Sequence, residues 1–158
     1  VNGHCVAGGV GRAAVMDVSV ALAGTSFGFT EVRVGVAPAV ISVVCLPKMR
    51  RGDALEAFVR GRRFDAAEAV RLGLITSCAA ADALDAVVGA VVDDLLAGEP
   101  TAIAEAKRLV YDVPGLSIDD AFAHTSEVSA RLFASDPARE GMAAYLEKRA
   151  APWVERAP

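Results

Sequence analysis

Apolar residues are spaced differently in the two halves of the chain. After Asp82 they stand at positions 84, 87, 88, 91, 92, 95 and 96, until Gly98 and Pro100 interrupt the pattern. A repeat of three and four residues places these side chains on one face of an α-helix. Similar patterns predict three more helices, over 101–111, from Ser117 or Asp119 to 133, and over 136–149. The sequence therefore predicts an all-helical region over residues 81–158.

The first half of the chain mixes short strands with short helices. Short or alternating apolar runs predict strands over 17–22, 26–30 and 74–78. Helices are predicted over 9–16, over 38–47, from Asp53 onward as N-cap, and over 66–72 between an N-cap at Asp65 and a stop at Gly73. Since strands occur only up to residue 78, we expect an α/β core over residues 1–80 rather than a doubly wound sheet throughout.

The composition indicates one globular domain without a nucleic-acid or membrane partner. The 158 residues carry a net charge of −4, which argues against a nucleic-acid footprint, and 54% of them are hydrophobic. The longest uncharged run, 34–47, contains two prolines and is too short for a spanning helix. No secretion signal is visible. Three widely spaced cysteines, Cys5, Cys45 and Cys78, fit buried reduced thiols, so we expect a cytoplasmic protein.

A glycine-rich loop lies at the start of the chain and opens the first predicted helix. Residues 1–2 are expected to end a strand, and residues 3–9 to form the loop. Glycines let backbone N–H groups approach a ligand, and the unpaired N–H groups at a helix start favour negative charge. The loop could cradle a phosphate or form an oxyanion hole for an ester or thioester carbonyl. Alternatively, Gly8 and Gly9 only permit close packing.

Glu31 is the second candidate for chemistry. It follows the apolar residues Phe27 and Phe29, and a carboxyl group in such surroundings suits a general acid or base. The alternative is a solvated glutamate that pairs with Arg33 or Lys48.

A dinucleotide-binding motif is a further interpretation of the same residues. Residues 9–14 fit the pattern G-x-G-x-x-A, and Glu31 lies twenty residues beyond Gly11, near the place of a ribose-binding acid. Only one βαβ unit can be drawn around this motif, so it stays an alternative.

The other polar residues form no metal-binding pattern. His4 and His124 are 120 residues apart, and neither has ligand-type neighbours in sequence, so a structural or solvated role is expected. The arginine pairs at 50–51 and 62–63 are expected on solvated faces, or alternatively near an anionic ligand.

Several segments, taken in order, resemble one enzyme family. The run VNGHCVAGGVG over residues 1–11, Asp17, and the run FGFTEVRVGVAP over residues 27–38 are similar to the signature of the enoyl-CoA hydratase/isomerase (crotonase) superfamily. Residues 64–69, 72–75 and 139–149 resemble its later landmarks. The resemblance covers essentially the whole chain. It implies a partial spiral of ββα units followed by a helical trimerisation region.

The resemblance also implies a substrate and a site. The substrate is an acyl-CoA thioester, as in fatty acid metabolism, whose enolate is held in an oxyanion hole by two backbone N–H groups. Gly8 falls where the family places the second of these donors, and Glu31 falls on the glutamate that moves a proton at the acyl chain. Lys148 falls where a basic residue reaches the CoA adenosine moiety. No metal or redox cofactor is implied, and the expected assembly is a homotrimer or hexamer.

Two departures from the family pattern bear on the reaction. The first hydratase glutamate would fall at Gly11, so no pair of carboxylates is available to activate water. The expected reaction is hydration of a 2-enoyl-CoA, and the alternatives are Δ3,Δ2-enoyl-CoA isomerisation, acyl-CoA binding without catalysis, and dinucleotide binding. The family's N-terminal part, which supplies the first oxyanion donor, is not matched. We therefore expect these 158 residues alone to be poorly active.

Overall fold

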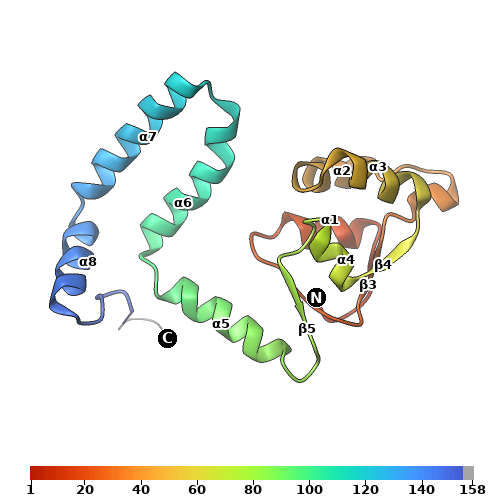
Figure 1. The fold of residues 1–158 in the computed structure, drawn as a ribbon, viewed down its shortest axis with the longest axis horizontal. Coiled ribbons are helices and arrows are strands. Elements are labelled where there is room, and N and C mark those ends of the chain that lie inside the picture. Colours follow the sequence, from red (N-terminus) through yellow and green to blue (C-terminus); the bar gives the residue numbers. More distant parts are fainter. Residues whose placement is uncertain (155–158) are drawn as a thin grey trace. The chain divides into compact units, whose positions relative to one another are not determined.

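The computed structural model describes residues 1–154 of the chain (Figure 1). The chain divides into two compact units, residues 1–89 and the segment from Ala90 onward. The first unit mixes strands and helices, whereas the described part of the second contains helices without strands. The predicted order of an α/β core followed by a helical region is therefore confirmed.

The first unit is built from five short strands and a larger set of helices. The strands are β1 (Cys5–Val6), β2 (Val20–Leu22), β3 (Ser26–Gly28), β4 (Arg63–Asp65) and β5 (Ser77–Ala79). The helices are α1 (Gly8–Val15), η1 (Glu31–Val34), α2 (Ala39–Cys45), η2 (Leu46–Lys48), α3 (Arg51–Arg60), α4 (Ala66–Arg71) and α5 (Leu84–Leu96), of which α5 continues into the second unit.

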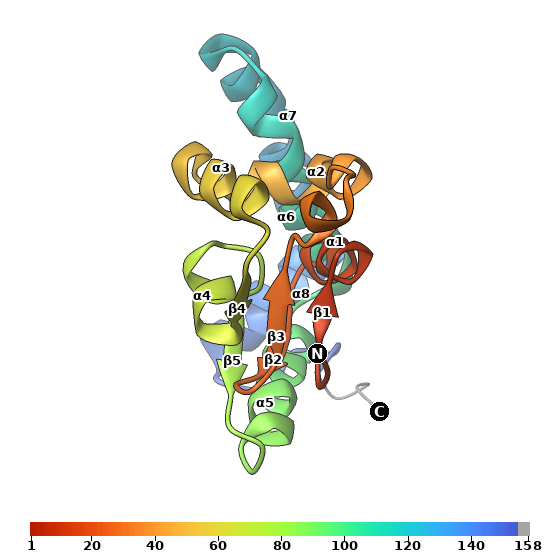
Figure 2. The same cartoon turned by 90° about the vertical axis from the view of Figure 1, so that its right-hand side faces the viewer.

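The strands form two small sheets. One sheet has the order β1-β3-β4, with β1 parallel to β3 and β4 antiparallel to it (Figure 2). Its register places Cys5 opposite Phe27 and Phe27 opposite Phe64. In the other sheet, β2 pairs with β5 in parallel. Both sheets join segments that lie far apart in the sequence, so the pairing fixes the topology of the unit.

The core of the first unit lies between these strands and the helices that cover them. Phe27 and Phe29 are fully buried, and the ring of Phe29 lies 4.3 Å from that of Phe58, centroid to centroid. Helix α1 buries Val10 together with small residues, and it packs directly against α2. Burial of each such large side chain stabilises the fold by roughly 1.5–3 kcal/mol. The small residues of α1 let the two helices approach closely.

Local sequence signals fix several helix ends as predicted. The Asp65 carboxylate accepts a 2.8 Å hydrogen bond from the N–H of Glu68, which caps α4. Gly73 follows α4 in the left-handed region, with φ of +80°. Pro38 directly precedes α2. The signals at Asp65 and Gly73 are confirmed, whereas Pro38 stands at the N-cap, one residue before the helix in whose first turn it was predicted.

Asp53 does not cap a helix as predicted. Helix α3 begins two residues earlier, at Arg51, with Arg50 in the N-cap position. Asp53 therefore lies inside the first turn, and its carboxylate accepts a 2.7 Å bond from Nε of Arg50. The prediction was wrong because the preference of aspartate for the first turn is easily mistaken for a preference for the cap itself.

The strands are shorter than predicted, and some are shifted. The predicted strand 17–22 is reduced to β2, and the predicted strand 74–78 is shifted to β5. Leu74 and Ile75 are apolar because they fill the core in a turn, not because they belong to a strand. The first strand is β1, which lies inside the segment predicted to be a loop.

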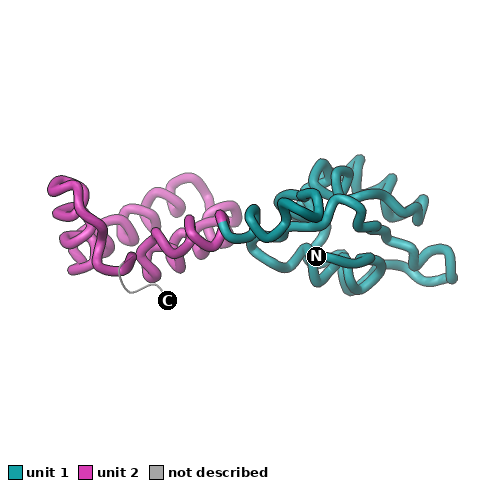
Figure 3. Tube along the Cα trace, turned by 90° about the horizontal axis from the view of Figure 1, so that it is seen from below, with its two compact units in different colours: residues 1–89 teal, residues 90–158 magenta. Residues whose placement is uncertain are grey.

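The second unit consists of helices joined by short turns (Figure 3). Besides the end of α5, they are α6 (Pro100–Asp112), η3 (Val113–Gly115), α7 (Ile118–Phe133) and α8 (Asp136–Glu147). The side chains of Glu99, Ser117 and Ser135 accept backbone N–H groups and cap α6, α7 and α8. This confirms Ser117, rather than Asp119, as the start signal of α7. Within residues 1–154, no helix is long and apolar enough to cross a membrane.

Two long-range contacts join segments of the second unit. Glu105 of α6 is buried and binds Arg131 of α7 at 3.2 Å and Arg108 at 3.0 Å. These guanidinium groups, Arg131 above all, hold the pKa of Glu105 below its usual range. Further along, the indole N–H of Trp153 donates a 3.0 Å bond to the carbonyl oxygen of Ala97.

Candidate active site

Two neighbouring parallel strands present the main site residues at the same edge of the sheet. Gly8 begins α1 directly beyond β1, and Glu31 begins η1 shortly beyond β3. The N–H of Ala7 donates a 3.0 Å bond to the carbonyl oxygen of Gly28, so the two strand ends are tied together. Ligands of open α/β sheets bind beyond the carboxyl ends of parallel strands. This edge is therefore the candidate site.

Gly8 offers a free backbone donor at this edge. As the first residue of α1, it has an N–H without an intrahelical partner, in the positive field of the helix start. Among the described residues, no atom lies within 4 Å of the place where a Cβ on Gly8 would stand. Close packing therefore does not require glycine at this position.

Glu31 has a buried carboxylate oxygen that lacks a partner. Its Oε2 atom is shielded from solvent, and no described residue donates a hydrogen bond to it. Arg33 instead donates from Nε to the carbonyl oxygen of Gly61 at 2.6 Å, and Lys48 donates from Nζ to that of Met16 at 3.2 Å. Among the described residues, Glu31 therefore forms no ion pair with Arg33 or Lys48, and the pairing alternative has no support. A buried polar atom without a partner is a candidate position for a ligand or a transferred proton.

The thiol of Cys45 lies in the electrostatic reach of Glu31. Burial raises the pKa of Cys45 to about 11; Lys48 opposes this shift, while Glu31 and Cys5 add to it. Burial also raises the pKa of the Cys5 thiol. Cys45 therefore remains a neutral thiol near neutral pH, and it is not a nucleophile of this site.

Gly11 lies beneath a side chain of α2. A Cβ atom on Gly11 would stand 2.6 Å from Cγ2 and 3.0 Å from Cβ of Ile41. The contact between α1 and α2 thus uses the absence of a side chain at this position. From the sequence, Gly11 was interpreted as part of a G-x-G-x-x-A motif and as the place of a missing carboxylate, and its contact with Ile41 was not predicted. No local pattern in the sequence pairs Ile41 with Gly11, because the two residues lie on different helices.

The remaining site candidates stand elsewhere. Lys148 is exposed and caps the C-terminal end of α8 in the second unit, with φ of +55°, whereas Gly8 and Glu31 belong to the first unit. His4 is exposed, and its Nδ1 atom accepts a 3.4 Å bond from the N–H of Ser26. Within residues 1–154, no three His, Cys, Asp or Glu side chains are grouped to hold a metal ion.

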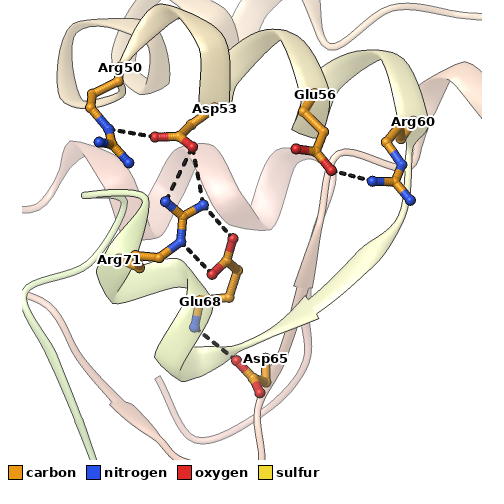
Figure 4. Close-up of polar contacts among 7 residues, drawn as sticks. All are labelled: Arg50, Asp53, Glu56, Arg60, Asp65, Glu68 and Arg71. Atoms are coloured by element: carbon orange, nitrogen blue, oxygen red, sulfur yellow. Dashed lines mark hydrogen bonds and ion pairs between the residues drawn. The ribbon is translucent and has the colours of Figure 1, made fainter.

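An arginine–carboxylate network joins α3 to α4 (Figure 4). Arg71 binds Asp53 at 3.2 Å and Glu68 at 2.7 Å, and it holds the pKa of both carboxyl groups below their usual range. Arg62 and Arg63 line the adjoining pocket of about 210 Å³. The charges of Arg50 and Arg71 are thus matched by carboxylates within the network, whereas Arg62 and Arg63 form no ion pair with any residue of the range 1–154.

Comparison with known proteins identifies the family. The family model described as enoyl-CoA hydratase/isomerase matches residues 1–156. The chain belongs to this family. Its glycine loop and Glu31 thus lie in a protein of the crotonase superfamily, and this favours the thioester interpretation of the loop over dinucleotide binding.

Individual proteins of this family are similar to the chain over nearly its whole length. A Mycobacterium tuberculosis protein named "Probable enoyl-CoA hydratase" is 30% identical over 157 residues, which cover 99% of this chain and 61% of that protein. A carnitinyl-CoA dehydratase of Proteus mirabilis is 29% identical over 162 residues, with 99% and 62% covered. The crystal structure of an enoyl-CoA hydratase from Mycobacterium smegmatis superimposes with a TM-score of 0.90 at 31% identity, over 97% of this chain and 60% of that one. The chain spans about 60% of the length of the relatives it matches.

Proposed function

We propose that this chain carries a proton-transfer site for acyl-CoA thioesters and that its reaction is the hydration of a 2-enoyl-CoA. The observation that carries the proposal is the unpartnered, buried Oε2 atom of Glu31 at the same sheet edge as the free N–H of Gly8. The Glu31 carboxylate can transfer a proton, and the Gly8 N–H can stabilise a developing negative charge. The names of relatives at about 30% identity support the choice of substrate.

In the proposed mechanism, the N–H of Gly8 donates to the thioester oxygen as it gains charge. Loss of one such donor removes roughly 2.7–4 kcal/mol of transition-state stabilisation. Glu31 orients a water molecule and accepts one of its protons as the water oxygen adds to C3, and Glu31 then delivers this proton to C2. The atoms of one water molecule are thus added across the double bond of the CoA thioester, which is the substrate, and the proposed reaction uses no cofactor. We propose that the other oxyanion donor, the first in the family pattern, comes from outside these 158 residues.

Isomerisation is a second candidate because of Gly11. The residue offers no carboxylate, and Ile41 covers it, so Glu31 is the one carboxylate assigned to the site. A single carboxylate can take a proton from C2 of a 3-enoyl-CoA and return it at C4, which moves the double bond without consuming water.

The test is the loss of the conjugated enoyl-thioester absorbance, measured on the complete polypeptide in which this chain occurs. Wild type should turn over the substrate, and Glu31→Gln should lose about 100-fold or more in rate while it still binds acyl-CoA. Glu56→Gln on α3 is the matched control, because Glu56 is exposed and pairs with Arg60. Equal binding without turnover in the wild type would instead indicate a non-catalytic acyl-CoA binder.

We further propose that the chain assembles as a homotrimer or a hexamer in the cytoplasm and that Lys148 binds the CoA adenosine moiety. Large apolar side chains are exposed on the helices of the second unit: Val110, Ile118, Phe122, Phe133, Tyr145 and Leu146. Exposed apolar groups of this kind mark association surfaces. Sedimentation should show an oligomer, and Lys148→Gln should raise KM with little change in kcat.

A further inference from the structure

Glu31 stands on the short helix η1, which buries no residue in the hydrophobic core. The helix is little more than one 3₁₀ turn, Glu31–Val34, and none of its residues is fully buried. The Oε2 atom of Glu31 is nevertheless shielded from solvent, without a hydrogen-bond donor among the described residues. Water would solvate this oxygen better, so the carboxylate keeps its place only if other contacts fix the backbone of η1.

Helix α3 contacts the chain on both sides of Glu31. Before Glu31, the ring of Phe29 packs on that of Phe58 in α3, at 4.3 Å between centroids. After Glu31, Val32 lies against the buried Gly61, the C-cap of α3, since a Cβ atom on Gly61 would stand 2.6 Å from Cγ2 of Val32. Residues 29 and 32 thus both rest on α3, and Glu31 lies between them.

Arg33 supplies the polar part of this attachment. Its Nε atom donates a 2.6 Å bond to the carbonyl oxygen of Gly61, and its Nη2 atom donates a 3.3 Å bond to that of Arg60. The last carbonyl groups of a helix lack intrahelical partners and form the negative end of its dipole. A guanidinium group suits them, because its charge is permanent and its donors are fixed in one fork. Arg33 thus ties η1 to the C-terminal end of α3.

We propose that Arg33 is a positioning residue, whose two bonds to the end of α3 hold η1 and so keep the Glu31 carboxylate at the place from which it transfers a proton. The inference rests on the proposed function and adds a residue to its site. Because Arg33 forms no ion pair with Glu31 in the described range, it acts through the backbone of η1. A displacement of about 1 Å at a reacting group can lower the rate about 100-fold.

Amide hydrogen exchange in the complete polypeptide tests whether Arg33 holds η1. The reporter is the N–H of Val36, which donates a 3.2 Å bond to the carbonyl oxygen of Glu31. Arg33→Ala should speed its exchange at least about tenfold, while the amides of α1 keep their wild-type rates. Arg60→Ala is the matched control, because the Arg60 side chain pairs with Glu56 and its carbonyl group remains. An unchanged rate at Val36 in Arg33→Ala would overturn the proposal.

The role in the reaction is tested by kcat and KM of the complete polypeptide. Arg33→Ala should lower kcat at least about tenfold and change KM less than about twofold, whereas Arg60→Ala should keep both wild-type values. In a Glu31→Gln background, Arg33→Ala should have little further effect on kcat, because Arg33 acts through Glu31. A purely structural role would lower kcat by the same factor in both backgrounds, and that result would overturn the proposal.

The two experiments separate failure of this inference from failure of the proposed function. If wild type converts neither a 2-enoyl-CoA nor a 3-enoyl-CoA, the proposed function is overturned, and the role of Arg33 in proton transfer is overturned with it. The exchange rate at Val36 would still decide whether Arg33 holds η1. If wild type is active and Arg33→Ala keeps its kcat, only the role of Arg33 is overturned.

Discussion

The N–H of Ala7 donates a 3.0 Å hydrogen bond to the carbonyl oxygen of Gly28 and so ties the start of α1 to the end of β3. In this arrangement Ala7 has φ of 48° and ψ of −125°, a conformation that residues with a Cβ rarely adopt. The strained residue directly precedes Gly8. Backbone strain thus lies where the proposed oxyanion donor is positioned.

Ala7→Gly should stabilise the protein. The substitution removes strain of about 1–3 kcal/mol, and it adds about 0.5–1 kcal/mol of unfavourable backbone entropy. We expect the free energy of unfolding to rise by roughly 1 kcal/mol, measured by urea denaturation. Ala67→Gly inside α4 is the control, and it should lower stability by about 0.5–1 kcal/mol. A loss at both positions would show that Ala7 is not strained.

Local chemistry made part of this fold predictable. Asp65 and Gly73 could be assigned from sequence because a cap and a left-handed stop depend on the residue itself and its immediate neighbours. Strand β1 could not, because two residues are too few to show a period of two. The glycine loop and Glu31 were singled out by residue type and apolar neighbours, and the specific roles of Gly8 and Glu31 followed from family resemblance, not from periodicity.

The contacts that shape the site could not be predicted, because they join segments that are distant in sequence. Ile41 meets Gly11 across two helices, and Arg71 reaches Asp53 from a different helix. Such pairs depend on how α1, α2, α3 and α4 pack, which a single sequence does not encode in any local pattern.

Gly73→Ala should be far more destabilising than Gly35→Ala. Both glycines have left-handed φ values, +80° and +83°, so both substitutions bear a conformational cost of about 1–2 kcal/mol. A Cβ on Gly73 would also overlap the carbonyl oxygen of Lys48, whereas no described atom lies within 4 Å of a Cβ on Gly35. Overpacking adds about 1–3 kcal/mol. Equal losses in chemical denaturation would contradict the close approach of Lys48.

Arg71→Gln should lower the free energy of unfolding at neutral pH and change it little in acid. Arg71 lowers the folded-state pKa of Asp53 and Glu68 below their ordinary values of 3.8 and 4.5. A carboxyl group whose pKa is lower in the folded than in the unfolded state stabilises the folded state at pH values above its unfolded-state pKa. This stabilisation is lost as the pH falls through the folded-state pKa. The difference in the free energy of unfolding between wild type and variant should therefore disappear as the pH falls below about 4.

Urea midpoints over a pH series measure this difference. Arg62→Gln is the matched control, because Arg62 forms no ion pair with any residue in the described range 1–154. The urea midpoint of Arg62→Gln should differ from that of wild type by the same amount at every pH. A difference for Arg71→Gln that persists unchanged into acid would argue against the lowered pKa values.

Alkylation should distinguish the thiols of the native protein. Cys78 is only half-buried, whereas Cys45 is fully buried and has a pKa of about 11. At pH 8 only about one Cys45 in 1,000 is a thiolate, and the thiolate is the reactive form. Pulsed iodoacetamide labelling with mass spectrometry should therefore modify Cys78 first and Cys45 only on unfolding. Early labelling of Cys45 would show that α2 opens readily.

Glu31→Leu should separate stability from activity. The Oε2 atom of Glu31 is buried without a hydrogen-bond donor among the described residues, and such an atom destabilises a fold by about 1–3 kcal/mol. Leucine removes this atom and keeps an apolar side chain of similar volume, so the free energy of unfolding should rise by roughly 1 kcal/mol while turnover is lost. Glu56→Leu, at an exposed position, should change stability by less than about 0.5 kcal/mol.

A rise in stability with loss of turnover would mean that Glu31 is retained at the expense of the fold, as expected for a group whose partner is the substrate. A fall in stability would mean that the carboxylate has a partner in the folded protein. In that case the unpartnered oxygen would no longer support Glu31 as the proton-transfer group, and the proposed function would rest on the family match alone.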